Sequence, residues 1–393
     1  MYYLNACGLV CALGDTMDAI KERLLGRPRS GVAVSDACSP GRALPLGAVS
    51  SRLPPVCQLP PPQRSRNNQL ALAALAQIRP AVDAAIALFG AGRVGIVIGT
   101  STSGILEAEN AMRQNTVDGT FPAAFQYSQQ EMGSPAAMLA GELGIVGPSY
   151  VHSSACASSA KAMASAARLI KMGLCDAVLT GGVDSLCAFT VAGFSALDSV
   201  SSVLCNPLSA NRNGINIGEG AALFLMSGIQ APVALCGWGE SSDGYHMSAP
   251  DPDGGGARLA MEQALARAKI APERIDYINL HGTATLQNDA MEARAVAALF
   301  GSMPAVSSTK PLTGHALGAA GAIEAALCWI AMQDDNPEGR LPPHLWDGVA
   351  DPALPVLNVV KPGTLLGRPL SWALSNSFAF GGSNAVLVLG RTA

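Results

Sequence analysis

The chain has 393 residues, of which 49% are hydrophobic and 14% are charged, and its formal net charge is −4. This length suggests two fused units of ordinary domain size, and the scarcity of charge indicates elements buried on both faces or against another subunit. No basic block or acidic tail is present, which argues against nucleic acid as a partner. The N-terminus lacks the basic segment of a signal peptide, and no apolar run reaches the ~18 residues of a membrane span.

Strand-like and helix-like segments alternate along the chain, which predicts an α/β fold. The order of elements restarts after residue 230, so we predict two similar halves, 1–230 and 231–393, although no strong sequence repeat is visible. The first residues are expected to form a strand. Further strands are expected at 94–99, 177–182, 221–226, 233–236, 277–280, 357–360 and 385–389, and helices at 68–78, 160–172, 257–268, 289–300 and 318–332.

The segment from Gly90 to Gly95 matches the pattern GxGxxG. It follows a helix and leads into a strand, which is the reverse of the order in dinucleotide-binding folds. We therefore interpret these glycines as the end of a helix and a turn.

Ten cysteines are spread along the chain without a CxxC pair or the spacing of a disulfide framework. In a chain of this length, reduced thiols in a cytoplasmic protein are the better interpretation. Most of these cysteines are expected to be small core residues.

Cys156 stands apart because of its setting in SSACASS, between a strand-like stretch and a run of small helix-forming residues. At the start of a helix, backbone amides and the helix dipole favour the reactive thiolate. Taken alone, Cys156 is better explained as a buried structural cysteine, and the histidine motifs reverse this preference.

Two of the five histidines lie in motifs of their own. His281 follows an apolar strand and opens the loop HGTAT, and a side chain in that position points into the kind of cleft that holds ligands in α/β folds. His315 lies between SSTK and GAAG. One cysteine nucleophile and two histidines together suit carbon–carbon bond formation on thioesters. The other histidines, His152, His246 and His344, are expected to be structural.

The segment NSFAFGGSN at residues 376–384 is predicted to be a glycine-rich loop between strands. Backbone amides in such a loop can face an oxyanion, although its two phenylalanines fit plain hairpin packing as well.

Together these motifs resemble the β-ketoacyl-acyl-carrier-protein synthases of the elongating kind. The resemblance covers nearly the whole chain in the right order and includes SACASS, HGTAT, STKPLTGHALGAAGAIE, NSFAFGGSN and the segments 213–220 and 243–247. The segment 64–68 and the chain length resemble more narrowly the elongating synthases of bacterial aryl-polyene clusters.

This resemblance implies a thiolase fold, with two similar halves in five α/β/α/β/α layers. It also implies a homodimer, or a heterodimer with a chain-length-factor-like subunit. Acyl carrier protein would present the substrates on its phosphopantetheine arm, and neither a metal nor another cofactor is expected.

By resemblance, each motif also carries a role. Cys156 takes up the acyl chain, while His281 and His315 bond the thioester oxygen of the malonyl group and assist decarboxylation. The other implied roles are support of the histidines by Lys310 and Glu324, binding of the phosphopantetheine arm by Thr283 and Thr285, gating by Phe378 and Phe380, an oxyanion hole from the N–H groups of Cys156 and Phe380, and carrier-protein docking by Arg64 and Arg66.

Several positions depart from the family pattern. Ala284 and Ala379 replace glycines, Leu286 replaces a proline, and Thr102 stands where a bulky apolar residue usually lines the acyl pocket. Ala379 is expected to stiffen the gating loop. Because of these departures, the enzyme need not accept the acyl chains of ordinary fatty-acid synthesis. Two pathways therefore stay open, fatty-acid synthesis and a dedicated polyene pathway.

Three other classes fit less well. A non-catalytic chain-length-factor-like subunit would lack Cys156, and a thiolase would need a second active cysteine, whereas no cysteine follows Cys328. The starter-unit synthases use a Cys-His-Asn set, but His315 stands in TGHALG.

Overall fold

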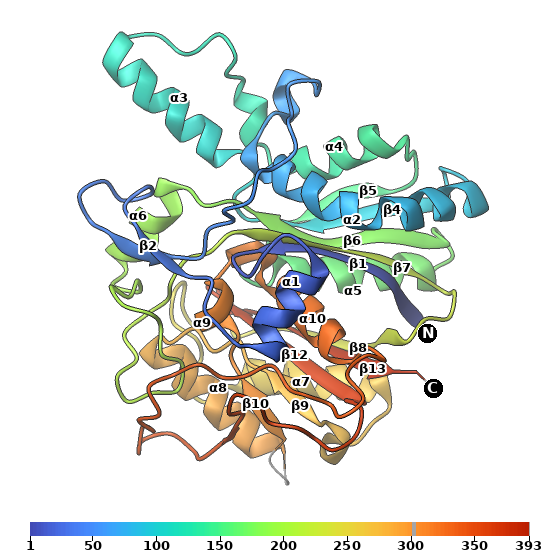
Figure 1. Cartoon of the computed structure of the whole chain (residues 1–393), viewed down its shortest axis with the longest axis vertical. Coiled ribbons are helices and arrows are strands. Elements are labelled where there is room, and N and C mark those ends of the chain that lie inside the picture. Colours follow the sequence, from blue (N-terminus) through green and yellow to red (C-terminus); the bar gives the residue numbers. More distant parts are fainter. Residues whose placement is uncertain (301–303, 393) are drawn as a thin grey trace.

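The computed structural model in Figure 1 describes residues 1–300 and 304–392. Within this part of the chain, eleven strands form one hydrogen-bonded sheet in the order β11-β10-β9-β12-β13-β8-β1-β7-β6-β4-β5. Only Tyr2 and Tyr3 of β1 pair with β8, so this junction divides the sheet into two sets of strands. The strands of the sheet are β1 (Tyr2–Cys11), β4 (Val94–Gly99), β5 (Ser149–His152), β6 (Ala177–Asp184), β7 (Gly220–Ser227), β8 (Val233–Ser242), β9 (Tyr277–Asn279), β10 (Ala305–Ser307), β11 (Asn358–Val359), β12 (Trp372–Ala379) and β13 (Ser383–Arg391).

The two sets of strands have the same internal order. The first runs β5-β4-β6-β7-β1, and the second runs β10-β9-β12-β13-β8 with β11 added at its edge. In each set the first two pairs are parallel and the next two are antiparallel. The predicted similarity of element order is therefore present in space, while the boundary between residues 230 and 231 stays a prediction.

Two helices, α5 (Ser158–Lys171) and α10 (Ala320–Ala331), lie between the two sets of strands. Helix α5 contacts β4 and β6 on one side and β8 and β13 on the other, and α10 contacts β7 and β12. Helices α2 (Arg66–Phe89) and α4 (Ser134–Leu143) cover the outer face of the first set, and α7 (Gly255–Ala268) with α8 (Leu286–Leu299) covers that of the second (Figure 1). These five layers confirm the predicted αβαβα sandwich.

The central layer is built from small residues because two helices must fit between the two sets of strands. Most side chains of α5 and α10 are alanine, glycine or serine, and nearly all of them are buried. A Cβ atom added to Gly321 would lie 3.1 Å from the Cβ of Ala160, so glycine is needed where α10 approaches α5.

The longest helix, α2, extends further along the chain than predicted. Helix α2 continues past residue 78 and through Pro80 to Phe89, where Gly90 ends it with a φ of 85°, as predicted for this glycine. Ser65 caps the other end by accepting a hydrogen bond from the Asn68 N–H. Among the described residues, α2 is also the one helix long and apolar enough to cross a membrane, by length and composition alone. It packs on β1, β6 and β7.

Smaller elements complete the chain. Strands β2 (Ala33–Ser35) and β3 (Leu44–Leu46) form a separate two-stranded sheet, and α1 is a short helix (Met17–Lys21). The sequence analysis predicts neither the short helices α1 and α9 (Lys310–Thr313) nor three longer ones, which are α3 (Ile105–Asp118), α6 (Ala188–Ala196) and α4. In Figure 1, α3 stands away from the layers, and only Ala108 and Ala111 of this helix are buried.

Ala284 provides a test of backbone strain. It has a φ of 65° and is completely buried, although alanine disfavours this left-handed conformation. Ala284→Gly is therefore expected to raise the free energy of unfolding by about 0.5–1 kcal/mol, because glycine adopts this conformation without strain. Urea denaturation would measure the change. Ala293→Gly within α8 is the matched control and should lower stability by at least about 1 kcal/mol; equal losses for both variants would contradict the strain.

Candidate active site

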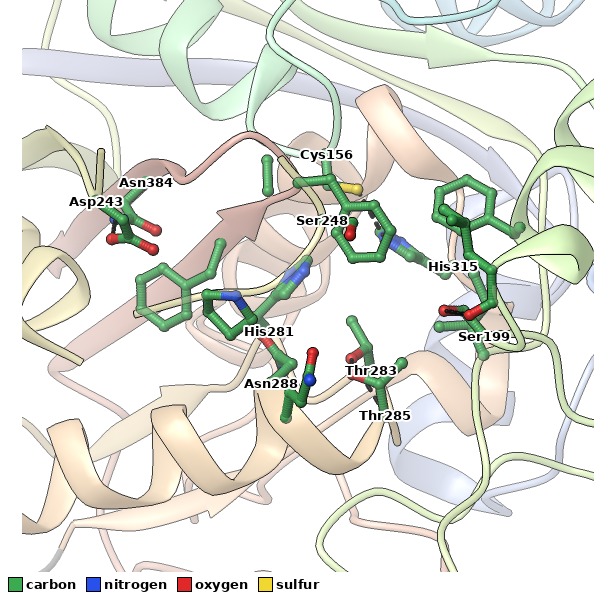
Figure 2. A pocket seen from close by; sticks show the side chains of 18 residues that line it. Cys156, Ser199, Asp243, Ser248, His281, Thr283, Thr285, Asn288, His315 and Asn384 are labelled. Carbon is green, nitrogen blue, oxygen red and sulfur yellow. Dashed lines mark hydrogen bonds between the residues drawn. The ribbon is translucent and has the colours of Figure 1, made fainter. Parts of the chain in front are cut away.

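The largest group of predicted site residues lines one cavity of about 120 Å³ between the two halves of the fold (Figure 2). Cys156 lies at one side of the cavity with the rings of His281 and His315 beside it, and Thr283 and Thr285 lie on the opposite side. The Cys156 sulfur and one ring nitrogen from each histidine lie within 4.8 Å of one another. Three motifs that are far apart in the sequence thus converge.

Cys156 lies in a tight turn between β5 and α5. The preceding residue, Ala155, has a φ of 47°, and Ser158 closes the turn by accepting from the Ser154 N–H and donating to the Ala155 carbonyl. Helix α5 begins at Ser158, so the prediction that Cys156 begins the helix is wrong by two residues. The helix still starts directly behind the nucleophile.

His315 is the closest histidine to the nucleophile, with 3.1 Å between its Nε2 and the Cys156 Sγ. Its backbone is held on both sides, because the His315 N–H donates to the Asn216 carbonyl and the Gly218 N–H donates to the His315 carbonyl. The segment 213–220, which contributed to the family resemblance, therefore positions this histidine.

His281 is held from α8 by a residue that the sequence analysis missed. The backbone N–H groups of His281 and Gly282 donate to the two carboxylate oxygens of Glu292, at 2.8 and 2.7 Å. The side-chain amide of Asn376 donates to the same carboxylate. Burial raises the pKa of Glu292 to about 7. The sequence offered one signal for this role, because Glu292 lies eleven residues after His281 on the buried face of the next helix.

Lys310 is a buried cation beneath the histidines. Its Nζ lies 2.5 Å from the Glu324 carboxylate and 3.5 Å from the Nδ1 of His281, and all three side chains are buried. The ring centroids of His281 and His315 are 5.3 Å apart at an interplanar angle of 83°. Of the two predicted supporting residues, Lys310 thus contacts His281 directly, and Glu324 contacts it through Lys310.

These surroundings determine the charges of the site. Burial, together with the positive charge of Lys310, holds the pKa of His281 and of His315 well below the ordinary range, so both imidazoles are neutral at physiological pH. Burial raises the pKa of the Cys156 thiol to about 12, although Lys310 acts in the opposite direction. Loss of solvent thus outweighs the nearby favourable charge, so the pKa of the Cys156 thiol is raised although the start of the helix favours the thiolate.

The tautomer of His281 follows from its neighbour. The protonated Lys310 has only donors, so the Nδ1 of His281 must accept from it. The neutral ring then carries its proton on Nε2, the other ring nitrogen.

Phe378 and Phe380 line the cavity, but the segment around them differs from its prediction. Residues 376–379 are the end of β12, and only the turn 380–382 lies outside the strands. Gly381 and Gly382 have φ values of 82° and 72°, so the conformational freedom of glycine is used there. Because Ala379 is a strand residue, the expectation that it stiffens a loop is wrong.

Three predicted residues lie elsewhere. Arg66 forms an ion pair with the buried Glu219 and donates to the Val49 carbonyl, so its guanidinium is tied to the protein interior. The Nε of Arg64 donates to the Leu59 carbonyl, 2.7 Å away. Thr102 is buried with its hydroxyl 2.9 Å from the Asp184 carboxylate and is absent from the cavity lining. Docking by Arg64 stays a prediction, whereas the contacts of Arg66 indicate a structural role.

Most of the cysteines are buried, as predicted. Of the three histidines expected to be structural, only His344 is buried, whereas His152 is half-buried and His246 is exposed. His344 is a satisfied core residue, with Nδ1 accepting from the Ser308 N–H and Nε2 lying 2.9 Å from the Pro207 carbonyl oxygen. All ten cysteines are free thiols.

The fold is that of the thiolase-fold acyltransferases, and its cavity brings together one cysteine and two neutral histidines. The chain belongs to the beta-ketoacyl synthase family, because the model of the N-terminal domain matches residues 62–231 and the model of the C-terminal domain matches residues 233–345. It is a ketosynthase.

Individual relatives agree with this assignment. The 3-oxoacyl-[acyl-carrier-protein] synthase 2 of Staphylococcus aureus is 32% identical over 318 residues, which cover 76% of this chain and 77% of the relative. A solved ketosynthase, ApeO, in complex with its chain length factor ApeC from Xenorhabdus doucetiae matches with a TM-score of 0.94 and 43% identity, over 100% of this chain and 98% of that chain. The ishigamide ketosynthase/chain length factor matches with a TM-score of 0.88 and 25% identity, over 100% and 99% of the two chains.

Removal of the buried cation tests the electrostatics of the site. In Lys310→Met the pKa of both histidines should rise, because the charge that disfavours their protonation is gone. The acidic limb of the pH–rate profile should then move to higher pH, and the maximal condensation rate should fall about tenfold to hundredfold. Steady-state rates between pH 5 and 9 would measure both changes. Lys310→Arg keeps the charge and should keep the limb near its original position; an unchanged limb in Lys310→Met would contradict the role of the charge.

Proposed function

We propose that the chain is a 3-oxoacyl-[acyl-carrier-protein] synthase that joins a malonyl unit, carried on acyl carrier protein, to an acyl group carried on Cys156, with loss of CO₂. The convergence of Cys156, His281 and His315 in one buried cavity is the observation that carries this proposal. Loss of CO₂ drives the condensation, and the phosphopantetheine arm of the carrier supplies the thioesters, so the reaction calls for no further cofactor.

Acyl transfer begins from a neutral thiol. As the Cys156 sulfur attacks the thioester carbonyl, its proton passes to the Nε2 of His315, which lies 3.1 Å away and belongs to a neutral ring. A new S–C bond forms, the bond between the carbonyl carbon and the sulfur of the carrier arm breaks, and that sulfur leaves with the proton. The depressed pKa of His315 makes it a transient proton carrier.

Condensation uses the histidines as hydrogen-bond donors. The Nε2–H of His281 bonds the thioester oxygen of the malonyl group, and His315 donates as well once its neutral ring has changed tautomer and carries its proton on Nε2. The carboxylate leaves as CO₂, and the carbanion attacks the carbonyl carbon of acyl-Cys156. The backbone N–H groups of Cys156 and Phe380 bind the oxyanion. Its collapse breaks the bond to the Cys156 sulfur, which leaves as a thiolate and takes up one proton from water, and the product is released on the carrier.

The opposite side of the cavity suits the carrier arm. Thr283 and Thr285 lie 3.0 Å apart through their hydroxyl oxygens and face the same space as Asn288 (Figure 2). Hydroxyl and amide groups match the amides of a phosphopantetheine chain. Phe380 contacts Phe194 of α6 with 5.4 Å between ring centroids, and this contact would have to change if the turn 380–382 opens as a gate.

The partner subunit is also a proposal. The neighbour with 43% identity was solved with its chain length factor, which favours a dedicated polyene pathway with a similar heterodimer over general fatty-acid synthesis. In addition, the arm formed by α3 and the residues after it exposes four large apolar side chains, as expected of a surface that another subunit covers. They are Met112, Val117, Phe121 and Tyr127. A cytoplasmic location rests on the ten free cysteines.

Replacement of the nucleophile is the direct test. Cys156→Ala should abolish formation of a covalent acyl adduct while the protein stays folded, because only one buried sulfur is removed. Intact-protein mass spectrometry after incubation with acyl-loaded carrier protein would show the adduct. Cys57→Ala, which removes an exposed thiol, is the matched control and should retain it. An acyl adduct that persists on the Cys156→Ala protein would contradict the assignment.

The two histidines should separate acylation from condensation. His281→Ala and His315→Ala are each expected to lower the condensation rate by at least about 100-fold, because a donor to the developing oxyanion is lost. Both should still accumulate acyl-Cys156, more slowly for His315→Ala because its proton acceptor is missing. Single-turnover assays with mass detection would measure each step, and a normal rate of product formation in either variant would refute the two-histidine role.

A further inference from the structure

A short extended segment, residues 215–219, lies between the loop of His315 and the residues that follow β3, and is called the strap below. On one side it pairs with His315, whose N–H donates to the Asn216 carbonyl at 2.7 Å. On the other side it pairs with Gly47, whose N–H donates to the Ile217 carbonyl at 2.9 Å. The strap therefore holds the backbone of the histidine that faces the nucleophile.

The strap and its two neighbours are packed backbone against backbone. A Cβ atom added to Gly218 would lie 2.6 Å from the Thr313 carbonyl oxygen, and one added to Gly47 would lie 2.0 Å from the same oxygen. A Cβ atom added to Gly314 would lie 3.0 Å from the Gly218 Cα. No flexible side chain separates these segments, so nothing between them could absorb a shift. A movement of the strap must therefore reach His315.

Glu219 fixes the end of the strap. Its side chain is 1% exposed, and its carboxylate accepts from the backbone N–H groups of Val49 and Leu186, each at 3.0 Å. Arg66, the first residue of α2, donates to both carboxylate oxygens, from Nε at 2.8 Å and from Nη2 at 2.5 Å. Of the groups that hold this carboxylate, Arg66 alone carries a charge.

The charge makes Arg66 the most important of these contacts. A buried carboxylate that loses its cation is left uncompensated, which costs much more than the loss of one neutral hydrogen bond. The planar guanidinium also orients the carboxylate, because it bonds both oxygens in a fixed geometry. Neither Arg66 nor Glu219 lines the catalytic cavity. Their connection to His315 therefore runs through the strap.

We propose that Arg66 is a positioning residue of the reaction, which acts through Glu219 and the strap to hold the Nε2 of His315 3.1 Å from the Cys156 sulfur. It rests on the proposed function in taking His315 as the acceptor of the Cys156 proton. As the thiol attacks, the S–H bond breaks and the proton passes to Nε2. Such a step depends on a short distance, and a misplacement of about 1 Å costs about 100-fold in rate.

A double-mutant cycle shows whether Arg66 acts through His315. Arg66→Met alone should slow the acylation of Cys156 about tenfold to hundredfold, because the unpaired Glu219 displaces the strap. In a His315→Ala background the same substitution should change the rate by less than about twofold, because the group that Arg66 positions is already gone. Single-turnover reactions at saturating acyl carrier protein, followed by intact-protein mass spectrometry, would measure the four rates.

Two further variants separate positioning from loss of folding. Arg66→Lys keeps the charge beside Glu219 but loses the two-pronged contact, so it should stay folded and show a loss of about fivefold that also disappears in the His315→Ala background. Arg79→Met is the matched control, because Arg79 lies in the same helix and forms its ion pairs with two carboxylates at the surface. It should leave the acylation rate within about twofold of wild type.

Alkylation of Cys156 by iodoacetamide provides a readout that needs no carrier protein. The thiol passes its proton to His315 as the new S–C bond forms and iodide leaves, so the same variants should show the same lack of additivity. Mass spectrometry of the alkylated peptide would measure the rate.

Two outcomes would overturn the role of Arg66. The first is an equal slowing by Arg66→Met with and without His315. The second is an effect that vanishes at saturating carrier protein, which would make Arg66 a docking residue. Wild type that shows no acyl transfer, together with non-additive alkylation, would count against the proposed function alone.

Discussion

The contact between α5 and α10 determines where the active site forms. These helices share the layer between the two sets of strands and meet through Ala160 and Gly321, where a larger residue would force them apart. One helix begins just behind Cys156, and the other begins just after the loop that carries His315. Because the contact fixes both ends, a sulfur and a nitrogen from residues 159 positions apart come within 3.1 Å. The alanine-rich composition of the helices is thus a condition for catalysis as well as for packing.

Burial in this layer has opposite effects on the reacting groups. It keeps His281 and His315 neutral and therefore able to donate or accept a proton, but it also keeps Cys156 protonated. Lys310 reinforces the effect on the histidines and opposes the effect on Cys156, and its own charge is balanced by Glu324. A dry site with one paired cation explains how a thiol, a donor and a proton acceptor coexist within a few ångströms.

Much of the fold and of the candidate site could be predicted from the sequence. Alternating apolar segments indicated most of the strands because strands buried on both faces read as unbroken hydrophobic runs. Cys156, His281, His315 and Lys310 were found because each stands in a local motif. Residues whose roles depend on distant contacts were missed or misjudged: Glu292 holds His281 from another helix, and Arg66 is bound by Glu219.

The sequence by itself determined the chemical groups, since side-chain type and local spacing are written in it. Only the tertiary structure decided their state. Whether Cys156 is a thiol or a thiolate, which nitrogen of His281 carries its proton, and whether residues 376–379 form a loop or a strand all depend on burial and on partners far along the chain. Burial is a property of the packed layers and not of any motif, because it arises only when both halves of the fold enclose the same cavity.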